Sequence, residues 1–233
     1  MNYKSRREAY SYPAVGLAGS LSSHQRKYFA STIALDEYHR NLLRSEREEK
    51  ALLGYLSVIY WGHYASSDGR NLAARAAARV TMARDGQSFK HNASVYRRRG
   101  LADFAPGAAF DTLQRAVVAL DGEQNSNAVR ILCELPQIQF AFATKLCAFI
   151  KPDSCGVMDS VLATRLPQFG FTVSKQGYVR LNQENLGRYD RYCAHLTQTA
   201  LELNLEMEHS RWVDRDQTQH AWRALDVERA LFG

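Results

Sequence analysis

Apolar residues recur at helical spacing along most of this 233-residue chain. Such spacing places apolar side chains on one face of a helix, which can then pack against a core. The pattern predicts helices over residues 22–34, 36–46, 48–64, 71–83, 111–120, 127–134, 140–150, 184–205 and 217–231. Apolar and polar residues alternate in part of the segment 171–181, which allows a short strand pair or an extended loop around Gly177. We therefore expect an all-α protein with this one exception.

The distribution of helix breakers predicts how the chain is divided. The hydrophobic periodicity is interrupted over residues 1–20 by Pro13, Gly16, Gly19 and several serines. This composition indicates a flexible N-terminal arm. We expect residues 21–125 to form an N-terminal helical part and residues 126–233 a second part. With 45% hydrophobic residues, the two parts can share one sizeable core.

The stretch Leu135–Leu166 carries the most specific pattern. Leu135-Pro136 ends one predicted helix, because proline disfavours a helical residue before it, and an apolar helix follows at once. Lys151-Pro152 ends that second helix, and Asp159 then suits the N-cap of a third. The result is a candidate helix-hairpin-helix, with Lys145 and Asp159 close to one junction.

This order resembles the helix-hairpin-helix DNA glycosylase superfamily, particularly its 8-oxoguanine DNA glycosylase branch. The segments Phe142–Phe149, Tyr60–His63 and Asp226–Phe232 are similar to a bacterial group with that fold. The resemblance covers roughly residues 53–233. It implies a DNA-binding repair enzyme, and members of the group often occur beside antiphage defence systems.

The chain departs from the superfamily at two places. Glutamines, Gln137 and Gln139, stand where the hairpin usually has glycines, which let its backbone approach a DNA phosphate closely. The lysine of bifunctional members follows the second glycine by two residues, and Ala141 occupies that place here. Lys145 lies one helical turn further along.

Asp159 and Lys145 are the candidate catalytic residues. A carboxylate near the sugar stabilises the positive charge that develops when an N-glycosidic bond breaks, or deprotonates the attacking group. A lysine among apolar residues can act as an amine nucleophile and form a Schiff base. Other interpretations remain open: Asp159 as a plain N-cap, Lys145 as a surface lysine with a buried stem, or a structural ion pair between them.

Aromatic and basic residues supply candidates for holding a nucleic acid. We expect Trp61, His63, Trp222 and Arg223 to contact an extruded base, with ordinary core packing as the alternative for each aromatic ring. The candidates for phosphate contact are Arg70, Arg97, Arg98, Arg99, Gln137 and Gln139. The net charge of +6 and a pI near 9.2 are compatible with a polyanionic partner.

The composition points to no metal and no cofactor. The four cysteines, Cys133, Cys147, Cys155 and Cys193, show neither a CxxC pair nor the grouping of an iron–sulfur cluster. No apolar run approaches the roughly 20 residues of a membrane span, and MNYKSRREAY lacks a signal peptide's apolar region. We expect a cytoplasmic protein without a membrane partner.

The leading hypothesis is a DNA glycosylase that recognises a modified purine base in DNA or in a nucleotide. Asp159 would stabilise the sugar cation or activate the nucleophile, and Lys145 would serve as the amine of a lyase. The first alternative is a catalytically inactive module that binds a base or nucleotide. The second is a scaffold subunit that binds other proteins of an antiphage defence operon.

Overall fold

The computed structural model of this chain describes residues 2–22, 25–65, 72–92, 94–207 and 210–232. Within these ranges the protein is mostly helical, with small antiparallel sheets of two strands each. The α-helices are α1 (Tyr3–Glu8), α2 (Thr32–Leu43), α3 (Glu48–Tyr64), α4 (Ala73–Asp85), α5 (Ala108–Asp121), α6 (Asn125–Leu132), α7 (Phe140–Ile150), α8 (Ser160–Arg165), α9 (Gln183–Leu205) and α10 (Ala224–Phe232). The strands are β1 (Val15–Ala18), β2 (Gln25–Tyr28), β3 (Gln87–His91), β4 (Ser94–Arg98), β5 (Trp212–Val213) and β6 (Gln219–His220). The expected mostly helical class is confirmed.

Helix α3 is the centre of the core. All of its residues from Ala51 to Trp61 are buried, which a helix tolerates only when neighbours cover every face. These neighbours are α2, α4, α7 and strand β1. Gly62 permits the close approach of α7, because a Cβ atom there would lie 2.6 Å from the ring of Phe142. No helix in the described ranges is long and apolar enough to cross a membrane.

Helices α6 and α7 are joined by residues 133–139, as the sequence predicted. Leu135 and Ile138 are buried in this connection, and the hydroxyl of Tyr55 on α3 donates a hydrogen bond to the carbonyl of Pro136. Gln137 has a positive φ of 60°, a conformation that favours glycine. The chain at Gln139 is extended, and α7 begins at Phe140.

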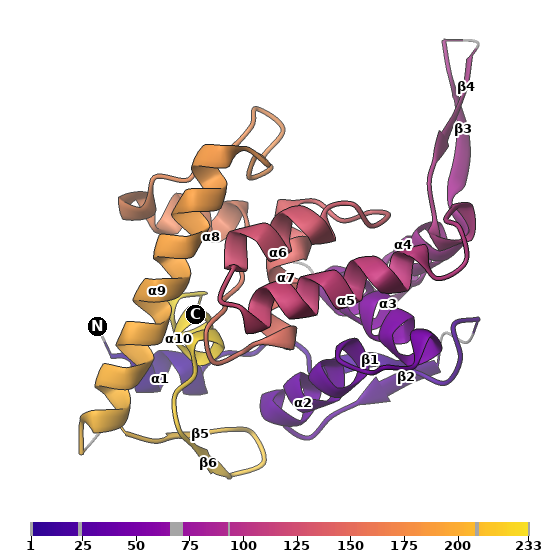
Figure 1. The fold of residues 1–233 in the computed structure, drawn as a ribbon. Helices are drawn as coiled ribbons and strands as arrows, with labels where there is room; N and C mark the ends of the chain where they lie inside the picture. Colours follow the sequence, from indigo (N-terminus) through magenta and orange to yellow (C-terminus); the bar gives the residue numbers. More distant parts are fainter. Residues whose placement is uncertain (1, 23–24, 66–71, 93, 208–209, 233) are drawn as a thin grey trace.

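Residues 2–20 of the predicted flexible arm contain regular elements that pack into the fold. They are helix α1 and strand β1, and α1 packs against α10 at the other end of the chain (Figure 1). The Arg7 side chain is buried and donates hydrogen bonds to Asp226 and Thr32. A turn-rich composition does not reveal a buried ion pair between residues so distant in sequence, which is why the expectation failed.

Three further segments differ from the sequence prediction. The expected helix over 22–34 contains strand β2 (Gln25–Tyr28) instead, and α2 begins only at Thr32, where Ser31 caps it. Strands β3 and β4 form an exposed hairpin in a segment where the sequence predicted no helix and no strand. The expected helix over 217–231 starts at Ala224, after strand β6. In the segment 171–181, Val173 and Val179 form a single β-bridge, so this loop is close to the predicted strand pair.

Candidate functional site

Lys145 and Asp159 meet in the structure. The Lys145 Nζ atom lies 3.7 Å from Oδ2 of Asp159, and both side chains are only partly exposed. This separation makes an ion pair without a direct hydrogen bond. The ammonium also lies 5.4 Å from the ring centre of Phe142, one turn earlier on α7. The sequence prediction that these two groups share one junction is confirmed.

Local hydrogen bonds fix the position of Asp159. Its Oδ1 atom accepts hydrogen bonds from the backbone N–H groups of Val161 and Leu162, at 3.0 and 3.1 Å, so the residue is the N-cap of α8. The preceding residue, Met158, is held by Thr144 of α7, whose hydroxyl accepts from the Met158 N–H at 3.0 Å. Thr144 is adjacent to Lys145, so this contact ties the carboxylate to the lysine helix.

Behind the pair lies a cavity of about 470 Å³, which we call the inner cavity. Aromatic side chains form much of its wall, namely those of Tyr10, Tyr12, Trp61, Phe149 and Phe232. Its charged residues are Lys145, Asp159, Arg165, Glu228 and Arg229. A cavity of this size with apolar walls and a few charged groups is typical of a small-molecule site.

Glu228 is the most unusual residue of the inner cavity. The residue is only 4% exposed, and its carboxyl group makes no hydrogen bond or ion pair with any described residue. Burial raises the pKa of this carboxyl to about 8, against the opposing charge of Arg229 and with a further increase from Asp159. The group is therefore largely protonated at neutral pH and can donate a hydrogen bond inside the cavity.

In front of the pair lies a second space of about 750 Å³, the basic cleft. Four arginines line it: Arg75 and Arg79 of α4, Arg98 at the end of β4, and Arg99. The α6–α7 connection contributes residues 134–139 to the opposite wall, including both Gln137 and Gln139. Asp159 lines both the basic cleft and the inner cavity, so the two spaces meet at the Lys145–Asp159 pair.

His63 lies on the basic cleft rather than in the inner cavity. Its ring packs on that of Phe142, with centres 4.7 Å apart. Burial lowers the pKa of His63 to about 4, and the charges of Arg79 and Arg75 lower it further. The imidazole is therefore neutral at pH 7, and its contribution to the cleft is a flat polar ring instead of a charge.

The structure brings together part of the predicted site. Trp61 lines the inner cavity with Lys145 and Asp159, while the cleft receives His63, Gln137, Gln139, Arg98 and Arg99. Arg97 lines neither space and pairs with Asp103, with 2.7 Å between Nη2 and Oδ1. Arg70 lies outside the described residues.

Trp222 and Arg223 do not reach the site. The Trp222 ring packs edge-on against Tyr3, and Arg223 pairs with Asp36 and Asp226 in the interior. Neither residue lines the inner cavity or the basic cleft. The resemblance to glycosylases that line the base pocket partly from a late helix suggested a base contact. Helix α10 begins only at Ala224, however, and the residues that it contributes to the inner cavity are Leu225, Glu228, Arg229 and Phe232.

Sequence reasoning missed several residues of the site. Glu228 gave no signal, because a single acidic residue in a helical pattern is usually solvated. Tyr10 and Tyr12 belong to the segment expected to be a flexible arm. Arg75 and Arg79 had a usable signal, since they stand four residues apart and therefore share one face of α4.

The described ranges contain no group of three or more His, Cys, Asp or Glu residues that could hold a metal ion. The four cysteines are free thiols. In comparisons with known proteins, no protein family, no curated protein and no solved structure gives a match to this chain.

Proposed function

We propose that this chain is a nucleic-acid N-glycosylase with an associated lyase step, built on a fold of the helix-hairpin-helix glycosylase type. One observation carries the proposal: the Lys145–Asp159 pair stands where a cavity lined by aromatic side chains meets an arginine-lined cleft. A base-removing enzyme needs these three parts, because the base must leave the stack while the backbone stays bound outside. The inner cavity would receive a purine base and the basic cleft its phosphates.

The charges at the junction suit cleavage of an N-glycosidic bond. As the bond between the base and C1′ breaks, the electron pair leaves with the base and positive charge develops on the sugar. The Asp159 carboxylate stabilises that charge. The Lys145 ammonium first loses a proton to solvent, which leaves the Asp159 carboxylate available to stabilise the sugar cation. The resulting amine bonds to C1′. Opening of the sugar ring then transfers one amine proton to the ring oxygen and releases the other to solvent, which gives an imine.

Glu228 supplies the remaining proton in this scheme. The departing base carries the electron pair of the broken bond and becomes a better leaving group when a ring nitrogen or carbonyl oxygen is protonated. A buried carboxyl whose pKa is raised to about 8 is protonated at neutral pH and lies on the wall of the same cavity. Solvent returns the proton after the base has left.

Borohydride trapping tests the proposal. The purified protein is incubated with borohydride and duplex or single-stranded DNA containing 8-oxoguanine, an abasic site or no lesion. We expect a covalent adduct with lesion-containing DNA that is lost in Lys145→Ala. Base release should fall by about 100-fold or more in Asp159→Asn. Lys175→Ala, an exposed lysine outside both spaces, is the matched control and should trap like the parent.

The outcome that contradicts catalysis is base release that neither Lys145→Ala nor Asp159→Asn changes. An adduct that persists in Lys145→Ala would instead assign the chemistry to another amine. Thermal unfolding of each variant, measured alongside, separates a lost reaction from a lost fold.

The hairpin favours a second candidate, a non-catalytic module that binds a base or nucleotide, alone or as a scaffold subunit of a defence complex. Gln137 and Gln139 replace small residues with side chains on the wall of the cleft, and Gln137 keeps the positive φ that favours glycine. A glutamine amide can donate to a phosphate but holds the backbone further away. Tight binding of a base without turnover of any damaged substrate would support this candidate.

A further inference from the structure

The most isolated part of the described structure is the β3–β4 arm, defined as residues Gln87–Arg98. Its two strands pair antiparallel and project away from the helical body (Figure 1). Every described side chain of β4 is exposed. A two-stranded hairpin without a packed face is marginally stable in water, so a binding partner would add to its stability.

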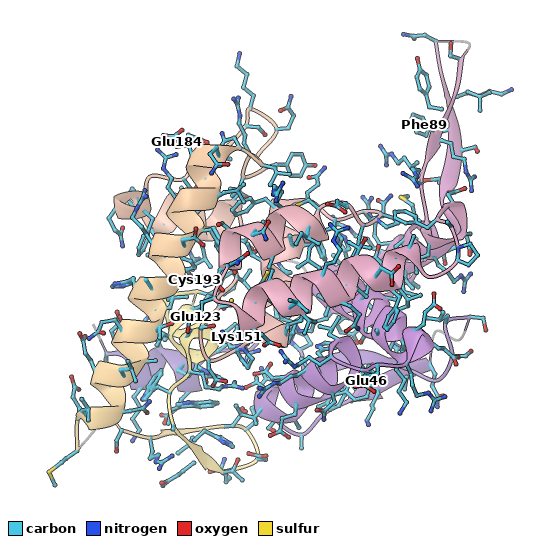
Figure 2. All side chains as sticks on the ribbon, viewed as in Figure 1. Glu46, Phe89, Glu123, Lys151, Glu184 and Cys193 are labelled. Atoms are coloured by element: carbon cyan, nitrogen blue, oxygen red, sulfur yellow. The ribbon has the colours of Figure 1, made fainter. Side chains whose placement is uncertain are left out.

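The arm has an unusual composition for such an exposed element. Its twelve residues include Lys90, Arg97 and Arg98 and no acidic residue. Phe89 and Tyr96 are opposite each other in the register, with rings stacked at 5.7 Å and exposed fractions of 38% and 48%. The Arg98 guanidinium lies 5.1 Å from the Phe89 ring centre on the same face. Figure 2 shows Phe89 on the arm, far from the packed helices.

The base of the arm is held rigidly against the body. Arg97 pairs with Asp103 and donates to the carbonyl of Asp85 at 3.0 Å, while Asp103 accepts from the Gly100 N–H at 2.9 Å. Gly86 and Gly100 lie back to back, because a Cβ atom on Gly100 would stand 2.1 Å from the Gly86 nitrogen. The direction of the arm is therefore set by contacts that leave no room for larger residues.

The aromatic face of the arm leads into the basic cleft. Arg98 belongs to that face and also lines the cleft, as does the next residue, Arg99. Positive charge thus runs from Arg75 and Arg79 through Arg99 to Arg98, which lies beside the ring of Phe89. This arrangement suits a polyanion that leaves the cleft along the arm.

We propose that the β3–β4 arm binds the single-stranded segment of DNA that leaves the basic cleft, with Phe89 and Tyr96 stacking on unpaired bases. Stacked exposed rings beside cations are the combination used to bind single strands, because every base presents a flat face and every nucleotide a phosphate. The inference rests on the proposed function for the ligand of the cleft, and it specifies that this ligand is a polymer rather than a free nucleotide.

The test measures binding of the full-length protein to a single-stranded oligonucleotide that carries 2-aminopurine at successive positions. The fluorescence of 2-aminopurine falls when the base stacks on an aromatic ring. We expect quenching at one or two positions in the parent and none in the double variant Phe89→Ala/Tyr96→Ala. Removal of each aromatic ring should weaken binding of the oligonucleotide by roughly 5- to 150-fold. Val95→Ala, on the opposite face of β4, is the matched control.

Salt dependence provides a second readout. Arg98→Ala should reduce the slope of log affinity against log salt concentration by about 0.7, which corresponds to one phosphate contact on a single strand. Unchanged affinity and unchanged quenching in the double variant would overturn the proposal. A shift in oligomeric state without any loss of DNA binding would also overturn it, and would assign the arm to contact with a second copy of the chain.

The two proposals fail in different ways. If the arm variants bind normally while Lys145→Ala abolishes trapping, the arm inference is wrong and the glycosylase proposal stands. If the arm variants lose binding while neither Lys145→Ala nor Asp159→Asn changes base release, the arm inference stands and the catalytic proposal is wrong.

Discussion

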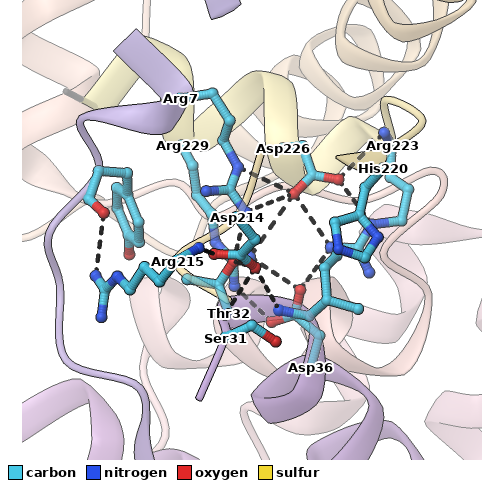
Figure 3. Close-up of polar contacts among 12 residues, drawn as sticks. Arg7, Ser31, Thr32, Asp36, Asp214, Arg215, His220, Arg223, Asp226 and Arg229 are labelled. Carbon is cyan, nitrogen blue, oxygen red and sulfur yellow. Dashed lines mark hydrogen bonds and ion pairs between the residues drawn. The ribbon is translucent and has the colours of Figure 1, made fainter. Parts of the chain in front are cut away.

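Two buried acidic residues of α10, Asp226 and Glu228, stand two positions apart and have opposite electrostatic surroundings. Asp226 accepts hydrogen bonds from Arg7 and Arg223 and lies near Arg229 (Figure 3). Glu228 makes no such contact in the described structure and lines the inner cavity. Burial alone would raise the pKa of Asp226, but the charges of Arg223 and Arg7 outweigh it and hold that pKa below its ordinary value. The pKa of Glu228 rises to about 8.

This difference separates a structural role from a functional one. Asp226, Asp36 and their arginine partners join α1, α2 and α10, and they satisfy one another almost completely. A buried carboxyl without a partner costs free energy and is normally neutral. A carboxyl group of this kind on a cavity wall, such as that of Glu228, is typical of a site where a ligand supplies its hydrogen-bond partner.

The largest effect is expected from removing the ion-paired carboxylate, Asp226. Asp226→Ala leaves the buried Arg7 without its ion-pair partner and Arg223 with Asp36 alone, and we expect it to lower the free energy of unfolding by roughly 3–5 kcal/mol. Urea denaturation at pH 7 measures this. A loss below about 1 kcal/mol would show that the ion pairs do not stabilise the junction of α1 and α10. Because the pKa of Asp226 is lowered on folding, its contribution is present above the unfolded pKa of about 4 and is lost as pH falls through the folded value.

An intermediate effect is expected from Glu228, the carboxyl group that lines the inner cavity. The pKa of Glu228 rises on folding, so the folded state binds the extra proton and stability falls as pH rises from about 4.5 to 8. His39 and His63, whose pKa values fall to about 3 and 4, give the opposite slope, but only below about pH 6.5. Between pH 6.5 and 8 the parent should lose roughly 2 kcal/mol relative to Glu228→Gln.

Urea denaturation of both proteins at pH 6.5, 7.2 and 8 checks this prediction. Parallel curves for the parent and Glu228→Gln would mean that the carboxyl is already ionised and hydrated, which would remove the proton donor from the proposed reaction. Asp153→Asn, an exposed carboxyl in the nearby turn, controls for a change of net charge.

The smallest effect is expected at the surface. Arg115 and Glu134 form an ion pair at 3.0 Å with about half of each side chain exposed. Solvent screens such a pair, so Arg115→Ala should change the free energy of unfolding by less than about 1 kcal/mol. The same urea experiment measures it. An effect as large as that of Asp226→Ala would show that the buried ion pairs of α10 stabilise the fold no more than an exposed one.

The local elements of the site follow from sequence, and their surroundings do not. Pro136 and Pro152 predicted the limits of α7, and the capping preference of aspartate predicted the position of Asp159. Both signals act within a few residues. Trp222 and Arg223 were assigned to the base site from their place near the end of the chain. The register of α10 instead turns Glu228 and Phe232 toward the cavity and Arg223 toward Asp36.

The sequence by itself determined a mostly helical protein, a helical hairpin at residues 127–150, and Lys145 close to Asp159. Hydrophobic periodicity and capping are local properties of the chain, which is why they could be read directly. Only the tertiary structure decided that residues 9–13 and α10 close the inner cavity, and that Arg7 is buried against Asp226. These contacts join the two ends of the chain, and no local pattern encodes which distant charges will meet once the core has formed.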